Sequence, residues 1–454
     1  MSSIYRTLQS IGERHRTYLE STYHLRNPGL ILQRRAAMQE PNTLVSEAFL
    51  EAPPRYAPST LRFEESELLR GPVADVLSAF AENNHGVFNP PYTHQIEALE
   101  AFFGQDLDVV VTTGTGSGKT EVFTNAILGR SALEGSIPPS EDGTIPAPST
   151  VDGLRTLVLY PMNALVSDQL TRIRQLFNIH SNESGSIARD VLQRFRPHAD
   201  RPFRFAMYTS RTPYHGTFDV DKNTTSIQPI VDLFNNAEGT DIGEQLESHG
   251  KVPQKNLIGF RNFNGRREHS YRTQQADTEY LTRQEMLDEV SRGQGGGTPD
   301  LLITNYSMLE YMLLRPIEQS LLDDTQEWLE MYPDQKLLIV MDEAHLYRGS
   351  GGSEVALLLR RLLGRLKIGP DRARFILTSA SFSGNAVDFA SQLTGKDVEN
   401  WHHQSAQPIQ YACSPEEGTE AQVRSLIQFG DNIGTNAEPR VDDLEVLIET
   451  FGWD

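Results

Sequence analysis

A glycine-rich run between a β-type segment and a helical segment constrains this chain more than any other feature. Residues 107–112 form an apolar run typical of a strand, residues 113–120 read TGTGSGKT, and EVFTNAILG follows with helical periodicity. A strand, a glycine-rich loop and a helix in this order are the context that a phosphate-binding loop requires. The strict pattern begins with glycine, whereas this chain has Thr113 in that place. The alternative is a glycine-rich turn without a ligand, which the GSGKT sequence in this context disfavours.

Each residue type in this loop has a chemical role. Glycines let backbone N–H groups converge on phosphate oxygens, and the start of the following helix adds a favourable dipole. We expect Lys119 to reach the β- and γ-phosphates and the Thr120 hydroxyl to bind Mg²⁺. ATP and Mg²⁺ are therefore the predicted cofactors. The predicted ATP-binding residues of the loop are Thr113, Gly114, Thr115, Gly116, Ser117, Gly118, Lys119 and Thr120.

A second motif follows another apolar run, residues 337–341, which ends in the sequence DEAH. An acidic residue at the carboxyl end of a parallel strand, beside the phosphate loop, lies where Mg²⁺ binds. We expect Asp342 to hold Mg²⁺, directly or through water, and Glu343 to act as the general base on the attacking water. His345 is expected to couple the γ-phosphate to neighbouring loops, and a hydrogen-bonded core histidine is the alternative. With Lys119, these three are the predicted catalytic residues.

From residue 89 onward, short β-type runs alternate with helical patterns. The further runs cover residues 156–160, 204–208, 300–304 and 375–378. Strands that are apolar on both faces and alternate with helices indicate a parallel sheet covered by helices on both faces. We therefore predict an α/β domain over residues 89–397. A helical N-terminal segment without a chemical role (1–88) precedes it, and an acidic tail or linker (398–454) follows.

Two insertions interrupt the predicted domain. Residues 131–153 are rich in Ser, Pro, Gly and acidic residues, and we expect a loop there. Residues 212–298 are too long for an ordinary connection, so they are expected to be a subdomain or a partly disordered excursion.

Basic residues gather around 194–204, around 360–367 and, with aromatic residues, around 260–272. The first two clusters could contact phosphates, but a charge run is more often a solvated face. The third could stack on bases, although a core-forming aromatic set beside a solvated basic loop is the favoured interpretation.

The overall composition excludes several classes of protein. The 454 residues include 41 Lys+Arg and 61 Asp+Glu, a net charge of -20, which argues against coating nucleic acid by bulk charge. Part of that charge lies in residues 414–454, with ten acidic and two basic residues, so local contacts to a strand remain compatible with it. The single cysteine, Cys413, excludes an intrachain disulfide and fits a reducing compartment, so a cytoplasmic location is expected. No run approaches about eighteen consecutive apolar residues, so no membrane span is expected.

Taken in order, the motifs resemble those of the first RecA-like domain of superfamily 2 DEAD/DEAH-box helicases. PYTHQ at 91–95 resembles the adenine-reading Q motif, and YPMNAL at 160–165 resembles motif Ia. TNYSML at 304–309 resembles the next nucleic-acid-contacting motif, and TSAS at 378–381 resembles motif III. The stretches TNYSMLEYMLLRP, DEAHLYRGSGGSEVALLLRRL and FASQLTG resemble more narrowly the large DEAH-type DNA helicases, some of which belong to bacterial anti-phage systems such as Druantia and DISARM. The resemblance covers about residues 89–397.

This resemblance implies a RecA-like P-loop NTPase fold and an ATP-dependent DNA helicase or translocase, with a possible role in anti-phage defence. The residues it implies are Gln95 for adenine contact, Ser379, Ala380 and Ser381 for coupling, and Pro161, Asn163, Thr304 and Asn305 for nucleic-acid contact. Helix starts at Asn163 and Asn305 could offer backbone amides to phosphates. Both asparagines could equally be helix N-caps, and both roles can hold at once. Only the narrower resemblance favours DNA over RNA as the partner.

Helicases of this superfamily hydrolyse ATP between two RecA-like domains. The second domain supplies arginines that stabilise charge on the transferred phosphoryl group, by a factor of about 10³ or more in related systems. Residues 382–454 are too few for such a domain and show no second alternating α/β pattern. We therefore expect the ATP-binding half of a motor that needs a second RecA-like domain, in cis or in trans. The alternatives are a nucleotide-binding regulatory or scaffold subunit without motor activity, and an RNA helicase.

Overall fold

The computed structural model divides the chain into two compact units, one formed by residues 1–53 and 410–454 and the other by residues 54–409. The structure describes residues 4–40, 43–44, 55–69, 71–114, 116–181, 185–212, 232–233, 236–237, 239–255, 276–287, 296–380, 385–406 and 409. Within these residues, no helix has both the length and the apolar character that a membrane crossing requires.

The first unit contains a pair of helices, α1 (Ile4–Thr22) and α2 (Pro28–Gln39). The start of α2 follows from its sequence, because the Asn27 side chain accepts a hydrogen bond from the Gly29 N–H at 2.8 Å. Arg35 on α2 forms an ion pair with Glu20 on α1 at 2.9 Å. No residue of α2 is buried, so local caps and polar contacts hold this pair together.

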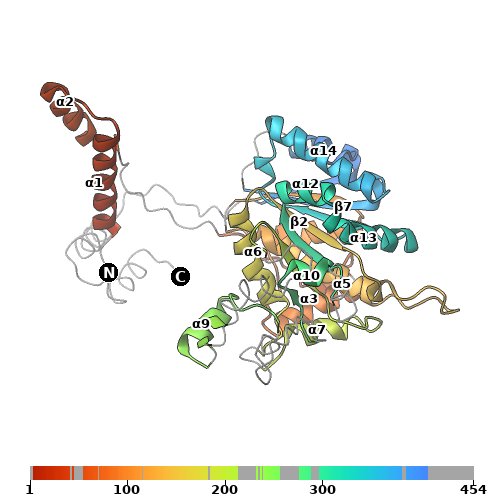
Figure 1. Cartoon of the computed structure of the whole chain (residues 1–454). Coiled ribbons are helices and arrows are strands. Elements are labelled where there is room, and N and C mark those ends of the chain that lie inside the picture. The colour runs from red at the N-terminus through yellow and green to blue at the C-terminus, as the bar shows by residue number, and fades with distance from the viewer. Residues whose placement is uncertain are drawn as a thin grey trace, which may run out of the picture. The chain divides into compact units, whose positions relative to one another are not determined.

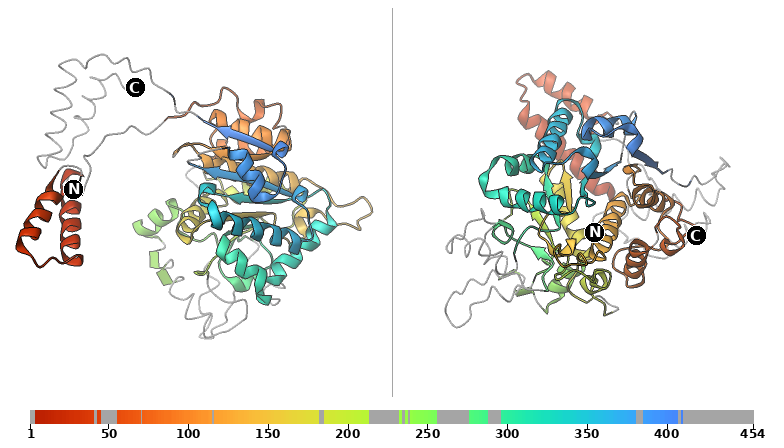
Figure 2. Two further views of the ribbon diagram at one scale, coloured as in Figure 1. Left: turned by 90° about the horizontal axis from the view of Figure 1, so that it is seen from above. Right: turned by 90° about the vertical axis from the view of Figure 1, so that its right-hand side faces the viewer.

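The second unit is built on one eight-stranded sheet in which every pairing is parallel (Figures 1 and 2). The strand order is β4-β3-β5-β2-β6-β7-β1-β8. The strands are β1 (Asp108–Thr112), β2 (Thr156–Tyr160), β3 (Phe205–Tyr208), β4 (Glu279–Tyr280), β5 (Leu301–Asn305), β6 (Leu337–Met341), β7 (Ala373–Ser379) and β8 (Trp401–Ser405). The predicted α/β fold with a parallel sheet is thus confirmed, and each of the six predicted strands is present.

Helices cover both faces of the sheet, because successive side chains of the inner strands enter two separate cores. In β1, Val109 and Val111 pack into one core and Val110 into the other. The first core is covered by α3 (Pro72–Glu82), α4 (Thr93–Leu99), the π-helical turn η2 (Glu100–Gly104), α5 (Lys119–Gly135), α6 (Asn163–Leu176) and α7 (Ala188–Arg194). The second core is covered by α10 (Arg283–Leu287), α12 (Tyr306–Leu314), α13 (Gln319–Met331), α14 (Gly349–Arg365) and α15 (Ala386–Thr394). Figure 1 shows α12, α13 and α14 on one side of the sheet and α3, α5 and α7 on the other.

The compact body extends beyond the predicted boundaries at residues 89 and 397. On the C-terminal side, β8 pairs with β1 from Asp108↔Trp401 to Thr112↔Ser405. On the N-terminal side, α3 contributes five buried residues to the first core. The first strand β1 therefore lies inside the sheet, shielded by a strand from the predicted tail.

The long predicted insertion, 212–298, is anchored to the sheet where the structure describes it. Its strand β4 pairs with β3 at the sheet edge, and α9 (Asp241–Ser248) lies earlier in the insertion. Lys255 is fully buried beside Asp277, at 3.1 Å, and Glu285. The aromatic and basic residues around 260–272 lie outside the described residues. In the shorter insertion, α5 continues to Gly135, five residues into the predicted loop.

Candidate nucleotide-binding site

The predicted phosphate loop connects the end of β1 to the start of α5. Gly116 and Gly118 have φ angles of +77° and +75°, a backbone conformation that favours glycine. A Cβ atom on Gly118 would also collide with the Gln95 amide, so both the backbone conformation and the lack of space require glycine there. Lys119 is the first residue of α5, which places it at the positive end of the helix dipole. Thr115 lies outside the described residues.

Thr113, which replaces the first glycine of the strict pattern, closes the loop with its side chain. Its hydroxyl oxygen lies 2.5 Å from that of Ser117, and both residues are buried. The next position has no room for a side chain, since a Cβ on Gly114 would lie 2.6 Å from the Tyr56 hydroxyl oxygen. The departure from the pattern therefore adds a cross-link within the loop and does not disrupt it.

The residues of the predicted Q motif hold the phosphate loop from outside. The His94 Nε2 lies 2.8 Å from the Ser117 carbonyl oxygen, and burial lowers the pKa of His94. Gln95 donates a hydrogen bond from Nε2 to the Gly118 carbonyl at 3.0 Å. Its Oε1 accepts one from the Tyr92 N–H at 2.9 Å. Both ends of the Gln95 amide thus have protein partners here, and its contact with adenine stays a prediction.

Asp342 and Glu343 lie at the carboxyl end of β6, as predicted. Asp342 is 6% exposed, and its Oδ1 accepts hydrogen bonds from the Thr378 hydroxyl and, at 2.9 Å, from the Glu343 N–H. Burial raises the pKa of Asp342, although these hydrogen bonds and Lys119 oppose the rise. Glu343 has a φ angle of +52°, a strained conformation that turns the chain sharply after the strand. For Lys119, burial lowers the pKa, because it disfavours the charged ammonium, and the carboxylates of Glu343 and Asp342 oppose this shift.

His345 connects the DEAH sequence to the end of β7, where motif III was predicted. Its Nδ1 lies 3.1 Å from the Ser379 Oγ and 3.3 Å from the Glu343 Oε2. Ser379 is buried, and its carbonyl accepts a hydrogen bond from the Thr113 N–H at 3.3 Å. The His345 side chain is 26% exposed, so it does not lie in the core, and it contacts both the predicted base and the predicted coupling motif. Ser381 lies outside the described residues.

A cavity of about 570 Å³ brings the two motifs together. Its wall includes Lys119 and Thr120 from α5 with Asp342 and Glu343 from the end of β6. The residues of the loop, the Q motif and motif III that also line it are Tyr92, Gln95, Gly116, Ser117, Gly118 and Ala380. Eight of the predicted ATP-binding, metal-binding and catalytic residues thus line one cavity, although Thr120 and Asp342 are 222 positions apart in the sequence.

Several residues in this wall were not predicted. Phe88, which is 71% exposed, and Pro58 belong to the N-terminal segment, for which the sequence predicts no chemical role. From α6 come Gln169 and Arg172, and Arg172 lies 3.5 Å from Glu121 Oε1 on α5. In the sequence, these residues stand out only by lying a few positions from a motif. Whether their side chains reach the cavity depends on how α5 and α6 pack.

The residues of the cavity fit ATP and Mg²⁺. Mg²⁺ in nucleotide sites is typically bound by one or two carboxylates together with phosphates and waters. Asp342 is a buried carboxyl with a raised pKa beside Thr120, and among the described residues no group of three or more His, Cys, Asp and Glu side chains forms a complete metal cage. A metal ion shared with a phosphate group therefore suits this donor set better than a metal held by protein alone.

The predicted nucleic-acid contacts lie at the same edge of the sheet, at the ends of β2 and β5. Asn305 donates a hydrogen bond from Nδ2 to the Asn163 Oδ1 at 2.5 Å, and Asn163 donates one to the Ser210 Oγ at 3.4 Å. Asn305 also caps α12 by accepting a hydrogen bond from the Met308 N–H at 2.8 Å. The N-cap alternative thus holds for Asn305, whereas Asn163 is the first residue of α6 and its cap position is Met162.

Two of the predicted contacts differ in accessibility. Pro161 is partly exposed beside Asn163. Thr304 has no exposed surface, and its hydroxyl donates to the Tyr208 carbonyl at 2.5 Å. The Thr304 side chain cannot reach a nucleic acid on this edge, because it points into the core between β3 and β5. A contact of Thr304 with nucleic acid could therefore not use its hydroxyl, and the assignment of Thr304 stays a prediction.

Most of the basic cluster at 194–204 is buried or half-buried, and only Arg194 of its four arginines is exposed. Arg196 is 1% exposed and Arg204 5% exposed. Arg201 pairs with the buried Asp300 at 2.6 Å, and Arg204 donates to the Tyr280 hydroxyl at 2.9 Å. These arginines hold the chain around the start of β3. In the second cluster, Arg365 pairs with Asp323 on α13.

Comparison with known proteins agrees with this arrangement. The model of the DEAD/DEAH box helicase family matches residues 92–198. Druantia protein DruE from Escherichia coli (strain UMEA 4076-1) is 38% identical over 484 aligned residues, which cover 100% of this chain and 25% of DruE. The uncharacterized ATP-dependent helicase YprA from Bacillus subtilis (strain 168) is 35% identical over 98 residues, which cover 22% of this chain and 12% of YprA. The chain thus spans a quarter of the length of DruE.

Solved structures of helicases also match, at low similarity. The crystal structure of the DUF1998 helicase MrfA bound to DNA and AMPPNP has a TM-score of 0.38 and 18% identity, covering 84% of this chain and 34% of that chain. The DEAD-box helicase Mss116 bound to ssRNA and UDP-BeF has a TM-score of 0.40 and 10% identity, covering 77% and 46%. The family match, the similarity to DruE along the whole chain and the order of the motifs around one parallel sheet identify a DEAD/DEAH box helicase domain in this chain.

Proposed function

We propose that this chain is the ATP-binding half of an ATP-dependent DNA helicase or translocase, which uses Mg²⁺ and needs a second RecA-like domain in cis or in trans. One observation carries the proposal: Lys119 and Thr120 share a cavity of about 570 Å³ with Asp342 and Glu343. Phosphoryl transfer to water requires a cation for the phosphates, a ligand for Mg²⁺ and a carboxylate to orient the water. All three kinds of group line the same wall.

Each residue has a defined part in this proposal. The backbone N–H groups at the start of α5 and the Lys119 ammonium bind the phosphates, while Thr120 and Asp342 hold Mg²⁺, which neutralises charge on the phosphate oxygens. Glu343 orients the water and accepts its proton. His345 contacts both Glu343 and Ser379, so it couples the position of the base to that of motif III.

Nucleic acid fits the carboxyl ends of β2 and β5, next to the end of β6 that carries Asp342. Asn163 and Asn305 are joined by a hydrogen bond at the starts of α6 and α12, and helix starts are favourable places for phosphates. The large DEAH-type DNA helicases, which three stretches of the sequence resemble, support DNA as the substrate. Similarity to a Druantia protein along the whole chain supports a role in anti-phage defence. A cytoplasmic location fits a nucleic-acid motor with a single cysteine. In the described part of the chain, no helix can span a membrane.

The test measures ATP hydrolysis with a second RecA-like half supplied, in the presence of single-stranded DNA, single-stranded RNA or neither. We expect DNA to stimulate hydrolysis, and Glu343→Gln to slow it by at least about 100-fold while nucleotide affinity is kept. Glu354→Gln is the matched control, since Glu354 is exposed on α14. Undiminished hydrolysis in Glu343→Gln would refute the catalytic assignment, and equal stimulation by RNA would refute the DNA preference. Nucleotide binding without hydrolysis under every condition would favour a scaffold subunit.

A further inference from the structure

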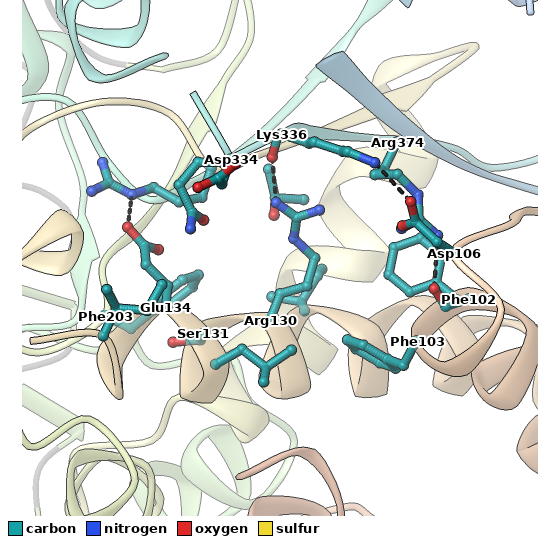
Figure 3. A pocket seen from close by; sticks show the side chains of 16 residues that line it. Phe102, Phe103, Asp106, Arg130, Ser131, Glu134, Phe203, Asp334, Lys336 and Arg374 are labelled. Atoms are coloured by element: carbon teal, nitrogen blue, oxygen red, sulfur yellow. Dashed lines mark hydrogen bonds and ion pairs between the residues drawn. The ribbon is translucent and has the colours of Figure 1, made fainter. Parts of the chain in front are cut away.

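A second cavity, of about 380 Å³ (Figure 3), lies at the opposite ends of the strands from the predicted nucleotide site. It is lined by residues at the amino-terminal ends of strands, such as Thr156 in β2 and Arg374 in β7, and by the second half of α5. The predicted nucleotide cavity lies at the carboxyl ends instead. Along α5, Lys119 and Arg130 are separated by about 16 Å at 1.5 Å per residue, so the two cavities contact the same helix at different turns.

Three of the four cations in this second cavity are paired with carboxylates. The pairs are Arg155 with Glu134 at 2.9 Å, Lys336 with Asp106 at 2.9 Å, and Arg374 with Asp108 at 3.0 Å. Their charges are therefore already compensated by the protein.

Arg130 is the exception. Its guanidinium donates to the Lys336 carbonyl, and no carboxylate oxygen of the described residues lies within 4.0 Å of it. In Figure 3 its side chain rises from α5 into the middle of the cavity. Burial lowers the pKa of Arg130 to about 10, so the group remains a cation at neutral pH. Arg130 is half-buried, and a half-buried cation without an ion-pair partner would gain from an anion bound in the cavity.

The rest of the wall limits what kind of anion fits. Phe102, Phe103 and Phe203 supply aromatic surface. The Ser131 hydroxyl, on a residue that is 3% exposed, has no hydrogen-bond partner among the residues that the structure describes. Asp334 adds a further carboxylate to this wall, and its charge disfavours a polyanion such as a nucleotide.

We propose that this cavity binds a small organic monoanion, with one carboxylate on the Arg130 guanidinium and an apolar or aromatic body against the phenylalanine rings. The geometry that carries the proposal is one unpaired cation among paired ones, inside a cavity with aromatic walls. The charged head and the apolar body are both required, since Arg130 alone would accept any anion and the rings alone any apolar molecule.

The probe is 4-fluorobenzoate, followed by ¹⁹F NMR and by titration calorimetry, with neutral 4-fluorobenzamide as its isostere. We expect millimolar binding of the benzoate, at least about tenfold weaker binding of the benzamide, and at least about tenfold loss of benzoate affinity in Arg130→Met. Arg130→Lys should keep part of the affinity. Arg361→Met, at an exposed position of α14, is the matched control and should bind like the unaltered protein.

Each other outcome would overturn the proposal. These are no binding of the benzoate, equal binding of the benzamide, or equal affinity in Arg130→Met and the unaltered protein. Lys119→Ala separates this cavity from the predicted nucleotide site, because benzoate affinity should not change in it and ATP should not displace the probe. Displacement by ATP together with loss of affinity in Lys119→Ala would assign the probe to the nucleotide site. If Arg130→Met fails to fold, the comparison of benzoate with benzamide and the Arg130→Lys variant still decide the question.

Discussion

The Nδ1 of His345 lies 3.1 Å from the Oγ of Ser379, so the DEAH sequence after β6 directly contacts the end of the neighbouring strand β7. The same ring lies 3.3 Å from the Glu343 carboxylate. Ser379 in turn accepts a backbone hydrogen bond from Thr113, the first residue of the phosphate loop. One short chain of contacts therefore joins the predicted base, the predicted coupling motif and the phosphate loop.

Because these contacts run through His345, we predict that His345→Ala uncouples ATP hydrolysis from nucleic-acid binding. Nucleotide affinity should stay within about twofold, because the histidine does not line the nucleotide cavity. Stimulation of hydrolysis by DNA should fall about tenfold, the typical cost of one lost hydrogen bond to a charged group. His345→Asn, whose amide can replace Nδ1, should restore part of the stimulation. The measurement is ATP hydrolysis with and without DNA in the presence of a second RecA-like half, and unchanged stimulation in His345→Ala would contradict the coupling role.

Arg172 is predicted to contribute to nucleotide binding. It lines the cavity from α6, and its nearest carboxylate is Glu121 at 3.5 Å. Arg172→Met should raise the Kd for ATP about three- to tenfold, in the range of one partly solvated charge interaction. Glu121→Gln separates two explanations, because it frees Arg172 without removing it. If Arg172 contacts the nucleotide, Glu121→Gln should leave the Kd unchanged or lower it. Equal weakening in both variants, measured with a fluorescent nucleotide, would mean that the ion pair only supports the wall.

The inner strands could be predicted because a buried parallel strand is apolar on both faces. Residues 156–160 and 337–341 satisfy this condition and form β2 and β6 as predicted. The edge strand β8, with the sequence WHHQS, was missed because an edge strand is not enclosed by neighbours and need not be apolar on both faces. The two-residue strand β4 is too short to carry any pattern.

The site shows a similar division. The positions of Lys119 and Asp342 could be predicted because the loop sequence and the end of a buried strand fix them locally. Arg172 and Phe88 could not, because packing of helices decides which side chains reach a cavity. Thr304 was assigned from its place in a motif, yet its hydroxyl turns toward Tyr208 in the core. A motif therefore located the sheet edge correctly without telling which of its side chains are exposed.

Asp342→Asn should raise thermal stability at neutral pH when no nucleotide or Mg²⁺ is present. Burial raises the pKa of Asp342, which means that the folded protein disfavours the ionised form. The sign follows: a raised carboxyl pKa gives stability at low pH, and this stability is lost as pH rises through the folded-state pKa. Asparagine keeps an oxygen for Thr378 and the Glu343 N–H but removes the charge.

The melting temperatures of the two proteins, measured from pH 4 to pH 8, check this prediction. The advantage of Asp342→Asn should shrink toward about pH 4, near the ordinary pKa of a carboxyl group. The variant should also lose Mg²⁺-dependent nucleotide binding. A lower melting temperature of the variant at neutral pH would show that the ionised carboxylate stabilises the fold, contrary to the burial argument.

Asp300 is expected to show the opposite pH dependence. Burial would raise the pKa of Asp300, but Arg201, Arg155 and Arg196 outweigh burial and lower it to about 2. A depressed carboxyl pKa contributes stability above the unfolded-state value of about 4, and this contribution is lost as pH falls toward 2. Asp300→Asn leaves Arg201 buried without its partner, so it should cost about 3 kcal/mol in the free energy of unfolding at pH 7. Asp397→Asn, at an exposed position, is the matched control. Urea unfolding at pH 7, with acid titrations between pH 5 and pH 2, measures both effects. A loss below about 1 kcal/mol, or an unchanged acid transition, would show that the arginines find other partners when the carboxylate is removed.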